Sequence, residues 1–250
     1  VHRLAEFRGK YILLDFWSRG CGPCIMSQPE LKEISEMYKD SLEVVSLSIE
    51  NRKGWEEASK SHVMTWNNWN DLEENNGLYA RYGVRGIPHF VLISPEGKVV
   101  DSWSGYAKGW LKLKIKGSMA PKQPMRIEWK DGHKVVHHPR KKTEKMEVLT
   151  IRQVELTDST TVLRVHARYI PNYWIRLDKA TFLMSDKGVN YPLLRSEGFA
   201  IDEQVFMPDS GEMDFTLYFA PLPKDTRWFD FSEGEHVEGG YYIEGIRLTE

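Results

Sequence analysis

The chain has 250 residues, 41% of them hydrophobic and 28% charged, and a formal net charge of -2. This composition indicates a globular protein with a substantial core, and so small a charge provides no general attraction to nucleic acid or to an anionic membrane. No apolar run approaches the roughly 20 residues that span a bilayer. The only two cysteines are Cys21 and Cys24, so a disulfide scaffold is excluded and packing must stabilise the fold.

The first part of the chain, residues 1–117, alternates strand and helix patterns. YILLDFW (11–17) is an almost continuous apolar run, which is typical of a central strand buried on both faces. A helical spacing of apolar residues follows from Pro23 to Lys39. Further strands are predicted at 42–49, 89–94 and 99–105, the last two joined by a PEGK turn, with short helices at 55–61 and 75–83. This order predicts a mixed sheet flanked by helices.

The alternation of strand and helix patterns ends at residues 118–124. This segment contains Pro and Ser and directly follows a Gly, which predicts a linker. Beyond it, in 125–250, short alternating segments predict strands at 146–156, 161–170, 180–185, 213–220 and 241–248. Their spacing is typical of an all-β antiparallel, Ig-like sandwich.

Three stretches of this second part have the composition of candidate ligand sites. The aromatic run RYIPNYWIRL (168–177) is interpreted as sandwich core rather than as a ligand platform. The basic run 137–145 is interpreted as a solvated loop. The acidic stretch 229–240 lacks the spacing of a calcium loop. The sequence therefore predicts no catalytic centre here, and the role of this domain stays open.

The two cysteines lie in GCGPC (20–24), between a strand and a helix. At a helix start, unpaired N–H groups and the positive end of the helix dipole stabilise a thiolate, which makes Cys21 the candidate nucleophile. Cys24 lies about one turn further on, where it can close a disulfide. Gly22 relieves crowding, and Pro23 fits the first helical turn. The spacing predicts that Cys21 attacks a substrate disulfide and that Cys24 resolves the mixed disulfide.

A Cys-X-X-Cys motif also has uses other than disulfide exchange. A structural zinc site needs four ligands, and the chain has no second cysteine pair, while His133, His137 and His138 lie in the other half. We therefore expect no metal and no cofactor beyond the redox-active Cys21–Cys24 pair. A peroxidase with a single peroxidatic cysteine is disfavoured by the CxxC spacing. Metal delivery through Cys21, Cys24 and His89 stays an alternative.

The motif and its surroundings resemble a known family. LLDFWSRGCGPC followed by IMSQPEL is similar to the active-site segment of the thioredoxin superfamily. RLAEFRGKYILLDFW, VVSLSIE and LYARYGVRGIPHFVLISPEGKVV resemble its exported TlpA-like branch, thiol-disulfide oxidoreductases related to the AhpC/TSA group. The resemblance covers roughly residues 1–116 and implies an α/β thioredoxin-like fold there.

The resemblance also implies roles for single residues. Asp15 matches a buried carboxylate beneath the thiols, whose raised pKa would let it exchange a proton with Cys24; the alternative is a carboxylate in water. Trp17 belongs to the motif, and Pro29 matches a proline that kinks the active-site helix. Pro88 matches the cis-proline opposite the disulfide.

A substrate groove is expected beside the disulfide. Pro88 would place the backbone of Ile87, after Gly86, to pair with a substrate strand. Gly20 stands where the family commonly has Trp, which should open the groove. His89 stands where Thr is common. It would shift the pKa of the thiolate or recognise the substrate; the alternative is a packed or exposed histidine without such a role.

The sequence thus predicts a two-domain thiol-disulfide oxidoreductase that reduces disulfides of exported proteins. Its partners would be disulfide-containing protein substrates and an upstream electron-donor protein, with no nucleic acid and a possible envelope association. The periplasm or cell envelope of a Gram-negative bacterium is the expected location, with the targeting segment outside this chain. The alternatives are an oxidant or isomerase of the same class, or a non-enzymatic metal-delivery or envelope-binding module.

Overall fold

The computed structural model describes residues 2–62, 64–71, 77–142, 148–234 and 240–250. The chain divides into two compact units, Val1–Met119 and Ala120–Glu250, and each is described by itself. In these described ranges no helix combines the length and the apolar character needed to cross a membrane.

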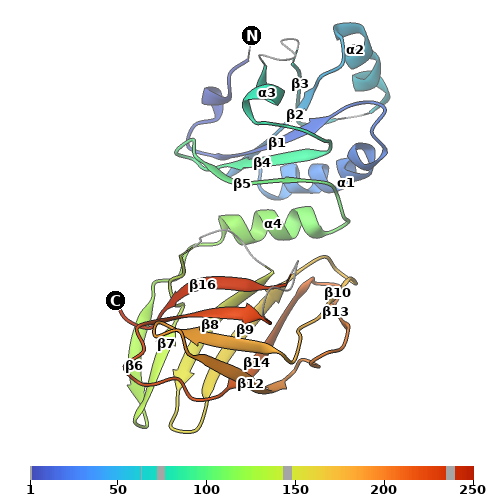
Figure 1. The fold of residues 1–250 in the computed structure, drawn as a ribbon. Coiled ribbons are helices and arrows are strands. Elements are labelled where there is room, and N and C mark those ends of the chain that lie inside the picture. The colour runs from blue at the N-terminus through green and yellow to red at the C-terminus, as the bar shows by residue number, and fades with distance from the viewer. Residues whose placement is uncertain (1, 63, 72–76, 143–147, 235–239) are drawn as a thin grey trace. The chain divides into compact units, whose positions relative to one another are not determined.

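The first unit is a five-stranded sheet in the order β3-β2-β1-β4-β5 with helices on both faces (Figure 1). Central β1 pairs parallel with β2 and antiparallel with β4, so the predicted mixed sheet is confirmed. The elements are η1 (Leu4–Phe7), β1 (Tyr11–Trp17), α1 (Gly22–Met37), β2 (Leu42–Ser48), α2 (Arg52–Ser61), β3 (Asn67–Asn70), α3 (Leu78–Arg81), β4 (His89–Ile93), β5 (Val99–Ser104) and α4 (Trp110–Met119).

The apolar run of β1 supplies both faces of this sheet, because successive side chains of a strand point to opposite sides. On one face Leu13 packs with Leu31 of α1 and Leu111 of α4. On the other, Leu14 and Phe16 belong to a cluster that includes α3 and η1 residues. The first face matters for function, because α1 begins at the two cysteines.

Three elements of the first unit were not predicted: η1, β3 and α4. The polar edge strand β3 lacks an apolar pattern and is held by parallel pairing with β2. Helix α4 follows from a tertiary contact. The buried carboxylate of Glu30 accepts hydrogen bonds from the backbone N–H groups of Gly109 (2.9 Å) and Lys112 (2.8 Å), which satisfies donors at the start of the helix. Because α4 ends at Met119, the predicted linker 118–124 begins inside its last turn.

All described elements of the second unit are strands, as predicted. Nine of them form one antiparallel sheet in the order β16-β15-β11-β12-β14-β9-β8-β7-β6, and β10 and β13 form a separate pair. Their bounds are β6 (Arg126–Lys130), β7 (His133–His137), β8 (Leu149–Leu156), β9 (Thr161–Arg168), β10 (Trp174–Ile175), β11 (Thr181–Ser185), β12 (Asn190–Glu197), β13 (Val205–Phe206), β14 (Glu212–Phe219), β15 (Trp228–Glu233) and β16 (Tyr242–Arg247).

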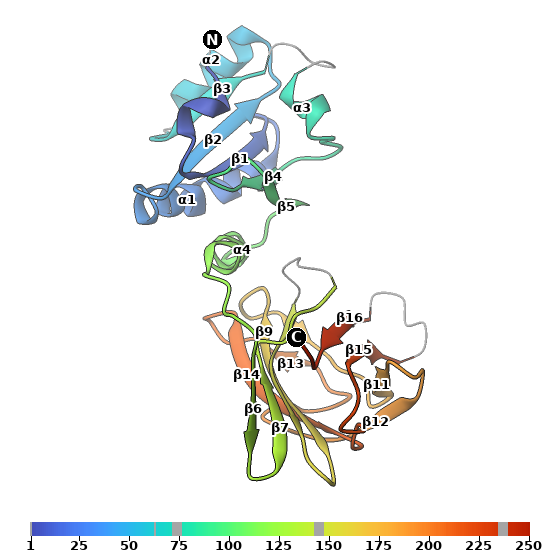
Figure 2. The same cartoon turned by 90° about the vertical axis from the view of Figure 1, so that its left-hand side faces the viewer.

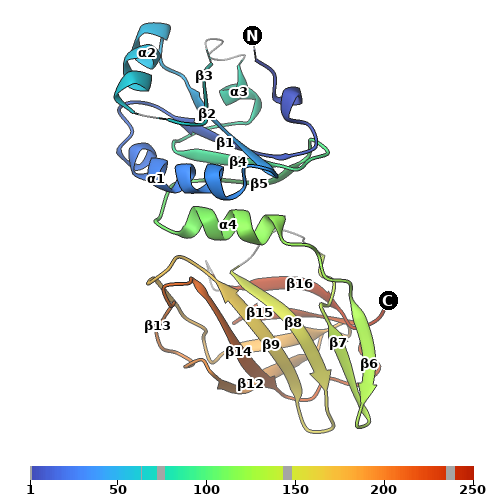
Figure 3. The same cartoon turned by 180° about the vertical axis from the view of Figure 1, so that it is seen from behind.

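Strand β12 is the corner that folds this sheet over one core. Its residues 190–192 pair with β11, whereas Leu193 and the residues after a bulge pair with β14. Figures 2 and 3 show the two halves of the sheet facing each other. Side chains from both halves, such as Leu163 of β9 and Phe231 of β15, belong to a single apolar cluster. The halves therefore enclose a core as a sandwich does, but they are joined through a shared strand.

The aromatic run 168–177 corrects one interpretation. Ile175 and Leu177 are buried, but Tyr173 and Trp174 are 57% and 44% exposed, so these two aromatic rings are not core. Trp174 lies in β10, which pairs with β13 outside the nine-stranded sheet. Parts of two other weighed stretches lie outside the described residues: 143–145 of the basic run and 235–239 of the acidic one.

Candidate functional site

Cys21 and Cys24 form a disulfide with an S–S distance of 2.00 Å at the start of α1. Cys21 is the N-cap residue, and its sulfur accepts a hydrogen bond from the backbone N–H of Cys24 at 3.2 Å. Gly22 and Pro23 occupy the first turn and are exposed, as is Gly20 before it. The helix terminus therefore directs N–H groups at the sulfur of Cys21, which favours a thiolate there when the pair is reduced.

The two sulfurs differ in access. Cys21 is half-buried, whereas Cys24 is 1% exposed. Cys24 packs with Trp17 of β1 and Ala58 of α2, and Ile87 and Trp55 lie against the same cluster. Cys21 is therefore accessible from solvent, whereas Cys24 is not.

The residues that pack around Trp17, next to Cys24, include three that the sequence did not predict: Trp55, Ser59 and Asn68. The indole N–H groups of Trp17 and Trp55 each lie 3.3 Å from Oδ1 of Asn68, whose amide nitrogen donates to Ser59 at 2.9 Å. Asn68 belongs to the unpredicted strand β3. The Trp- and Asn-rich stretch 65–71 was the available signal, because such side chains need polar partners when they are packed.

The Ile87–Pro88 segment lies beside the cysteines, because Ile87 packs against their cluster. The peptide bond between Ile87 and Pro88 is cis, the isomer that the resemblance implies. The carbonyl of Pro88 accepts from the N–H of Gly105 at 2.8 Å, whereas no backbone hydrogen bond within the described ranges involves Ile87. Gly86 is exposed and has open space where a Cβ would stand.

Asp15 is 1% exposed in β1, so the alternative of a carboxylate in water is wrong. Burial raises its pKa to about 7, and a hydrogen bond from Ser46 partly opposes this rise. Asp15 lies between Leu13 and Trp17 on one face of the strand. Because Leu13 packs with α1 and Trp17 packs with Cys24, the carboxyl faces the helix that carries the cysteines.

His89 proves to be a packed histidine. Its Nδ1 lies 2.8 Å from Oγ of Ser104 and its Nε2 lies 3.0 Å from Oγ of Ser102, both on β5. Burial lowers the pKa of this imidazole, which favours the neutral ring. Both ring nitrogens are thus engaged by the neighbouring strand.

Two further predicted features are placed by the structure. Pro29 lies inside α1, on its exposed side. Within the part of the chain that the structure describes, no group of three or more His, Cys, Asp or Glu side chains is arranged to hold a metal ion.

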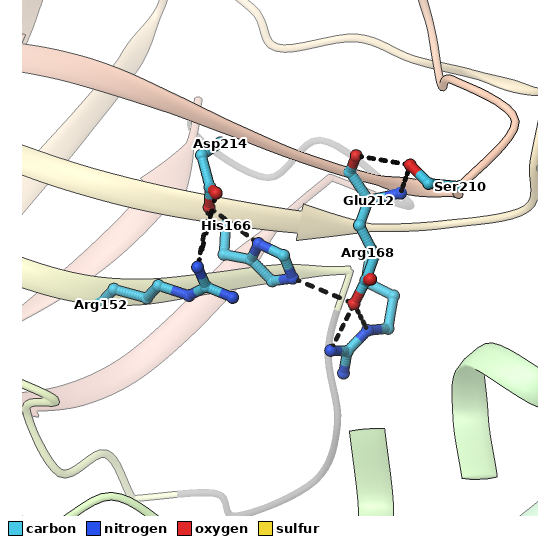
Figure 4. Close-up of polar contacts among 6 residues, drawn as sticks. All are labelled: Arg152, His166, Arg168, Ser210, Glu212 and Asp214. Atoms are coloured by element: carbon cyan, nitrogen blue, oxygen red, sulfur yellow. Dashed lines mark hydrogen bonds and ion pairs between the residues drawn. The ribbon is translucent and has the colours of Figure 1, made fainter. Parts of the chain in front are cut away.

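The second unit contains one conspicuous polar cluster (Figure 4). His166 of β9 is 7% exposed; its Nδ1 lies 2.8 Å from Asp214 and its Nε2 lies 3.5 Å from Glu212, both on β14. Arg168 and Arg152 pair with these carboxylates at 2.7 and 3.1 Å. Ser210, drawn nearby, hydrogen-bonds to the backbone of Glu212. The cluster is therefore an ionic network that joins β8, β9 and β14, with no serine hydroxyl directed at the histidine.

Comparison with known proteins places residues 9–99 in a family: they match the model of the family described as Thioredoxin-like. The chain is 26% identical over 99 residues to the thioredoxin-like protein YneN of Bacillus subtilis, covering 39% of this chain and 58% of that one. It is 30% identical over 100 residues to the thiol-disulfide oxidoreductase ResA of Geobacillus thermodenitrificans, covering 39% and 56%. The chain thus spans little more than half the length of these curated relatives.

Among solved structures, the thioredoxin domain of a thiol-disulfide oxidoreductase from Bacteroides vulgatus is 30% identical. That alignment covers 41% of this chain and 76% of the other, with a TM-score of 0.38. Residues 9–99, which match the family model, include β1, the Cys21–Cys24 pair and α1.

Proposed function

We propose that this chain, which belongs to the thioredoxin-like family through residues 9–99, is a thiol-disulfide oxidoreductase that reduces disulfides in exported proteins. The observation that carries the proposal is the unequal pair of sulfurs at the start of α1, with Cys21 accessible and Cys24 buried. Asp15, buried on the strand face that α1 covers, supports the proton chemistry that such an exchange requires.

The first step is an attack by the Cys21 thiolate on one sulfur of a substrate disulfide. That S–S bond breaks, a mixed disulfide forms, and the second substrate sulfur leaves as a thiolate that takes up a proton. Backbone groups of Ile87 would pair with the substrate chain, because nothing in the described structure occupies them.

The second step resolves the mixed disulfide. Asp15 in its carboxylate form accepts the proton of the Cys24 thiol, and the Cys24 thiolate attacks the sulfur of Cys21. The substrate leaves as a dithiol, having gained two electrons, and the Cys21–Cys24 disulfide is formed. An electron-donor protein then reduces this disulfide for the next cycle.

The location and direction belong to the same proposal. The resemblance to the exported TlpA-like branch favours the periplasm or cell envelope. The CGPC motif is that of thioredoxin, whose potential of about -270 mV makes it a reductant. Substrates are therefore proposed to be disulfide-containing proteins outside the cytoplasm.

Trapping tests the order of the two thiols. Cys24→Ser should accumulate mixed disulfides through Cys21, detected by non-reducing gels and mass spectrometry with a disulfide-containing protein substrate. Cys21→Ser is the matched control and should trap nothing. If Cys21→Ser accumulates the adducts instead, the proposed order of the thiols is wrong.

The reduction potential tests the direction. Equilibration with defined thiol-disulfide buffers and mass analysis of the Cys21–Cys24 state should give a value near -270 mV, roughly that of thioredoxin. A value near -120 mV, roughly that of a strong oxidant, would contradict a reductase and support disulfide formation or isomerisation.

A further inference from the structure

Among the described residues, the carboxyl of Asp15 has one hydrogen-bonding neighbour, and it comes from the adjacent strand. Asp15 of β1 and Ser46 of β2 are directly paired in the sheet, and Ser46 is fully buried. Oγ of Ser46 donates to Oδ2 of Asp15 at 2.7 Å. Oδ1 of Asp15 has no hydrogen-bond partner among the described residues. The two carboxyl oxygens are therefore unequal.

Ser46 is itself held by an indole. Nε1 of Trp66 donates to Oγ of Ser46 at 2.8 Å, and Trp66 immediately precedes edge strand β3. An indole N–H can only donate, so Ser46 must accept from it, and the single hydroxyl proton of Ser46 remains for Asp15. The hydrogen bonds thus run in one direction, from Trp66 through Ser46 to Asp15, and each bond strengthens the next.

Other ionisable groups around β1 are engaged elsewhere. Glu30 of α1 accepts from residues at the start of α4, Lys114 of α4 pairs with Asp101 at 2.5 Å, and His89 of β4 bonds two serines. Tyr79 of α3 lies within 2.9 Å of the carbonyls of Trp17 and Leu47. Burial and the bond from Ser46 are accordingly the two causes that set the pKa of Asp15.

We infer that Trp66 and Ser46 form a hydrogen-bond relay that orients the Asp15 carboxyl and directs its proton to Oδ1. The importance of this relay for turnover rests on the proposed oxidoreductase function. Ser46 and Trp66 are positioning residues, because they act through Asp15. Without the relay, the buried carboxyl would lose its own proton less readily, and less of the carboxylate form would be present to accept the proton of Cys24.

The first test is a titration that needs no turnover. The carboxyl carbon of Asp15 is followed by NMR against pH in the oxidised chain, in wild type and in Ser46→Ala, Ser46→Thr, Trp66→Phe and Ser48→Ala. Ser48 is the matched control: it is fully buried on the same strand, and its hydroxyl accepts from the backbone N–H of Glu50 at 3.2 Å.

The relay predicts an order of effects. Ser46→Ala should move the midpoint of Asp15 upward by about one pH unit, because it removes a hydrogen bond to the charged form. Trp66→Phe should move it upward by less, and Ser46→Thr, which retains the hydroxyl, should restore the wild-type value. An unchanged midpoint in both Ser46→Ala and Trp66→Phe, or an equal rise in Ser48→Ala, would overturn the inference.

The second test is kinetic and separates this inference from the proposed function. The pH profile of the resolving step, measured by stopped flow as release of the reduced substrate, should move upward in Ser46→Ala together with the NMR midpoint. A moved NMR midpoint with an unmoved kinetic profile supports the relay and contradicts proton transfer by Asp15. Absence of exchange in the wild type would reject the proposed function, while the titration still decides on the relay.

Discussion

Each unit of the molecule buries an aspartate, and the two carboxyls have different surroundings. Asp230 of the second unit is 4% exposed; its Oδ2 accepts from the hydroxyl of Tyr242 at 2.9 Å and its Oδ1 from the N–H of Gly245 at 2.7 Å. Asp15 has a donor on one oxygen only, and burial raises its pKa to about 7. Asp230, with both oxygens hydrogen-bonded, joins β15 to β16, whereas Asp15 keeps one oxygen without a partner among the described residues, where a proton can be held.

The same contrast extends to the charged groups. In the second unit the buried His166 lies between two carboxylates, each paired with an arginine. Around Asp15 no cation lowers the pKa, and only a neutral hydroxyl does so. The comparison indicates that the buried charged groups of the second unit pair with one another, whereas Asp15 of the first unit has no cationic partner that lowers its pKa.

The largest expected effect is on stability as a function of pH. The pKa of Asp15 is about 7 in the folded chain against an ordinary 3.8, so between these values the folded state binds a proton that the unfolded state lacks. The favourable contribution of this group is therefore complete below pH 3.8 and is lost as the pH rises through about 7.

Asp15→Asn removes this titration. Relative to wild type, the unfolding free energy of the first unit should rise between about pH 4 and pH 8, by up to about 4 kcal/mol. Urea unfolding of the oxidised chain, followed with a probe in the first unit, measures the difference. A difference that does not change with pH would contradict the raised pKa.

The next effect is on the resolving step. Asp15→Asn should slow resolution by Cys24 by about 100-fold, a typical contribution of a general base, while the attack by Cys21 changes little. Stopped-flow measurement of mixed-disulfide formation and decay separates the two steps. Equal slowing of both steps would contradict the proposed role of Asp15 in proton transfer.

Asp230→Asn is the matching change in the second unit. The amide nitrogen of asparagine cannot accept, so one of the donors at Gly245 and Tyr242 loses its partner, at a cost of about 2 kcal/mol. Asp230 bonds to residues of β16 in the second unit, whereas the cysteines belong to the first. Disulfide exchange should therefore keep its wild-type rate. A loss of exchange larger than the loss of folded protein would show that Asp230 does more than join strands.

The smallest effect is expected at His89. His89→Gln should lower the unfolding free energy by about 1 kcal/mol, because the exposed Ser102 and Ser104 can bond to water instead. The pKa of the Cys21 thiol, measured from thiolate absorbance in the reduced chain, should not change. A change of about one pH unit would restore His89 as a group that tunes the thiolate.

Much of the first unit could be predicted because its signals are local. The apolar run of β1, the PEGK turn and the Gly-Pro pair between the cysteines each favour one backbone conformation through nearby residues alone. Helix α4 could not, because Glu30, some 80 residues earlier, satisfies its first N–H groups. Strand β3 is polar and exists through pairing with β2.

In the second unit the sequence predicted antiparallel strands but not their arrangement. Alternation shows which side chains turn inward, but it does not show that β12 pairs with β11 through one half and with β14 through the other. Tyr173 and Trp174 are exposed although their composition favoured a core; Trp174 belongs to the short pair β10–β13, outside the nine-stranded sheet.

At the site, the sequence by itself determined the redox pair, its position at a helix start, and a carboxyl in an apolar strand, because these depend on neighbours in the chain. Tertiary structure alone decided that Cys24 is buried against Trp17 and Ala58, that His89 faces two serines, and that Ser46 and Trp66 serve Asp15. The physical reason is that burial and hydrogen-bond direction are set by strands and helices that meet only after folding.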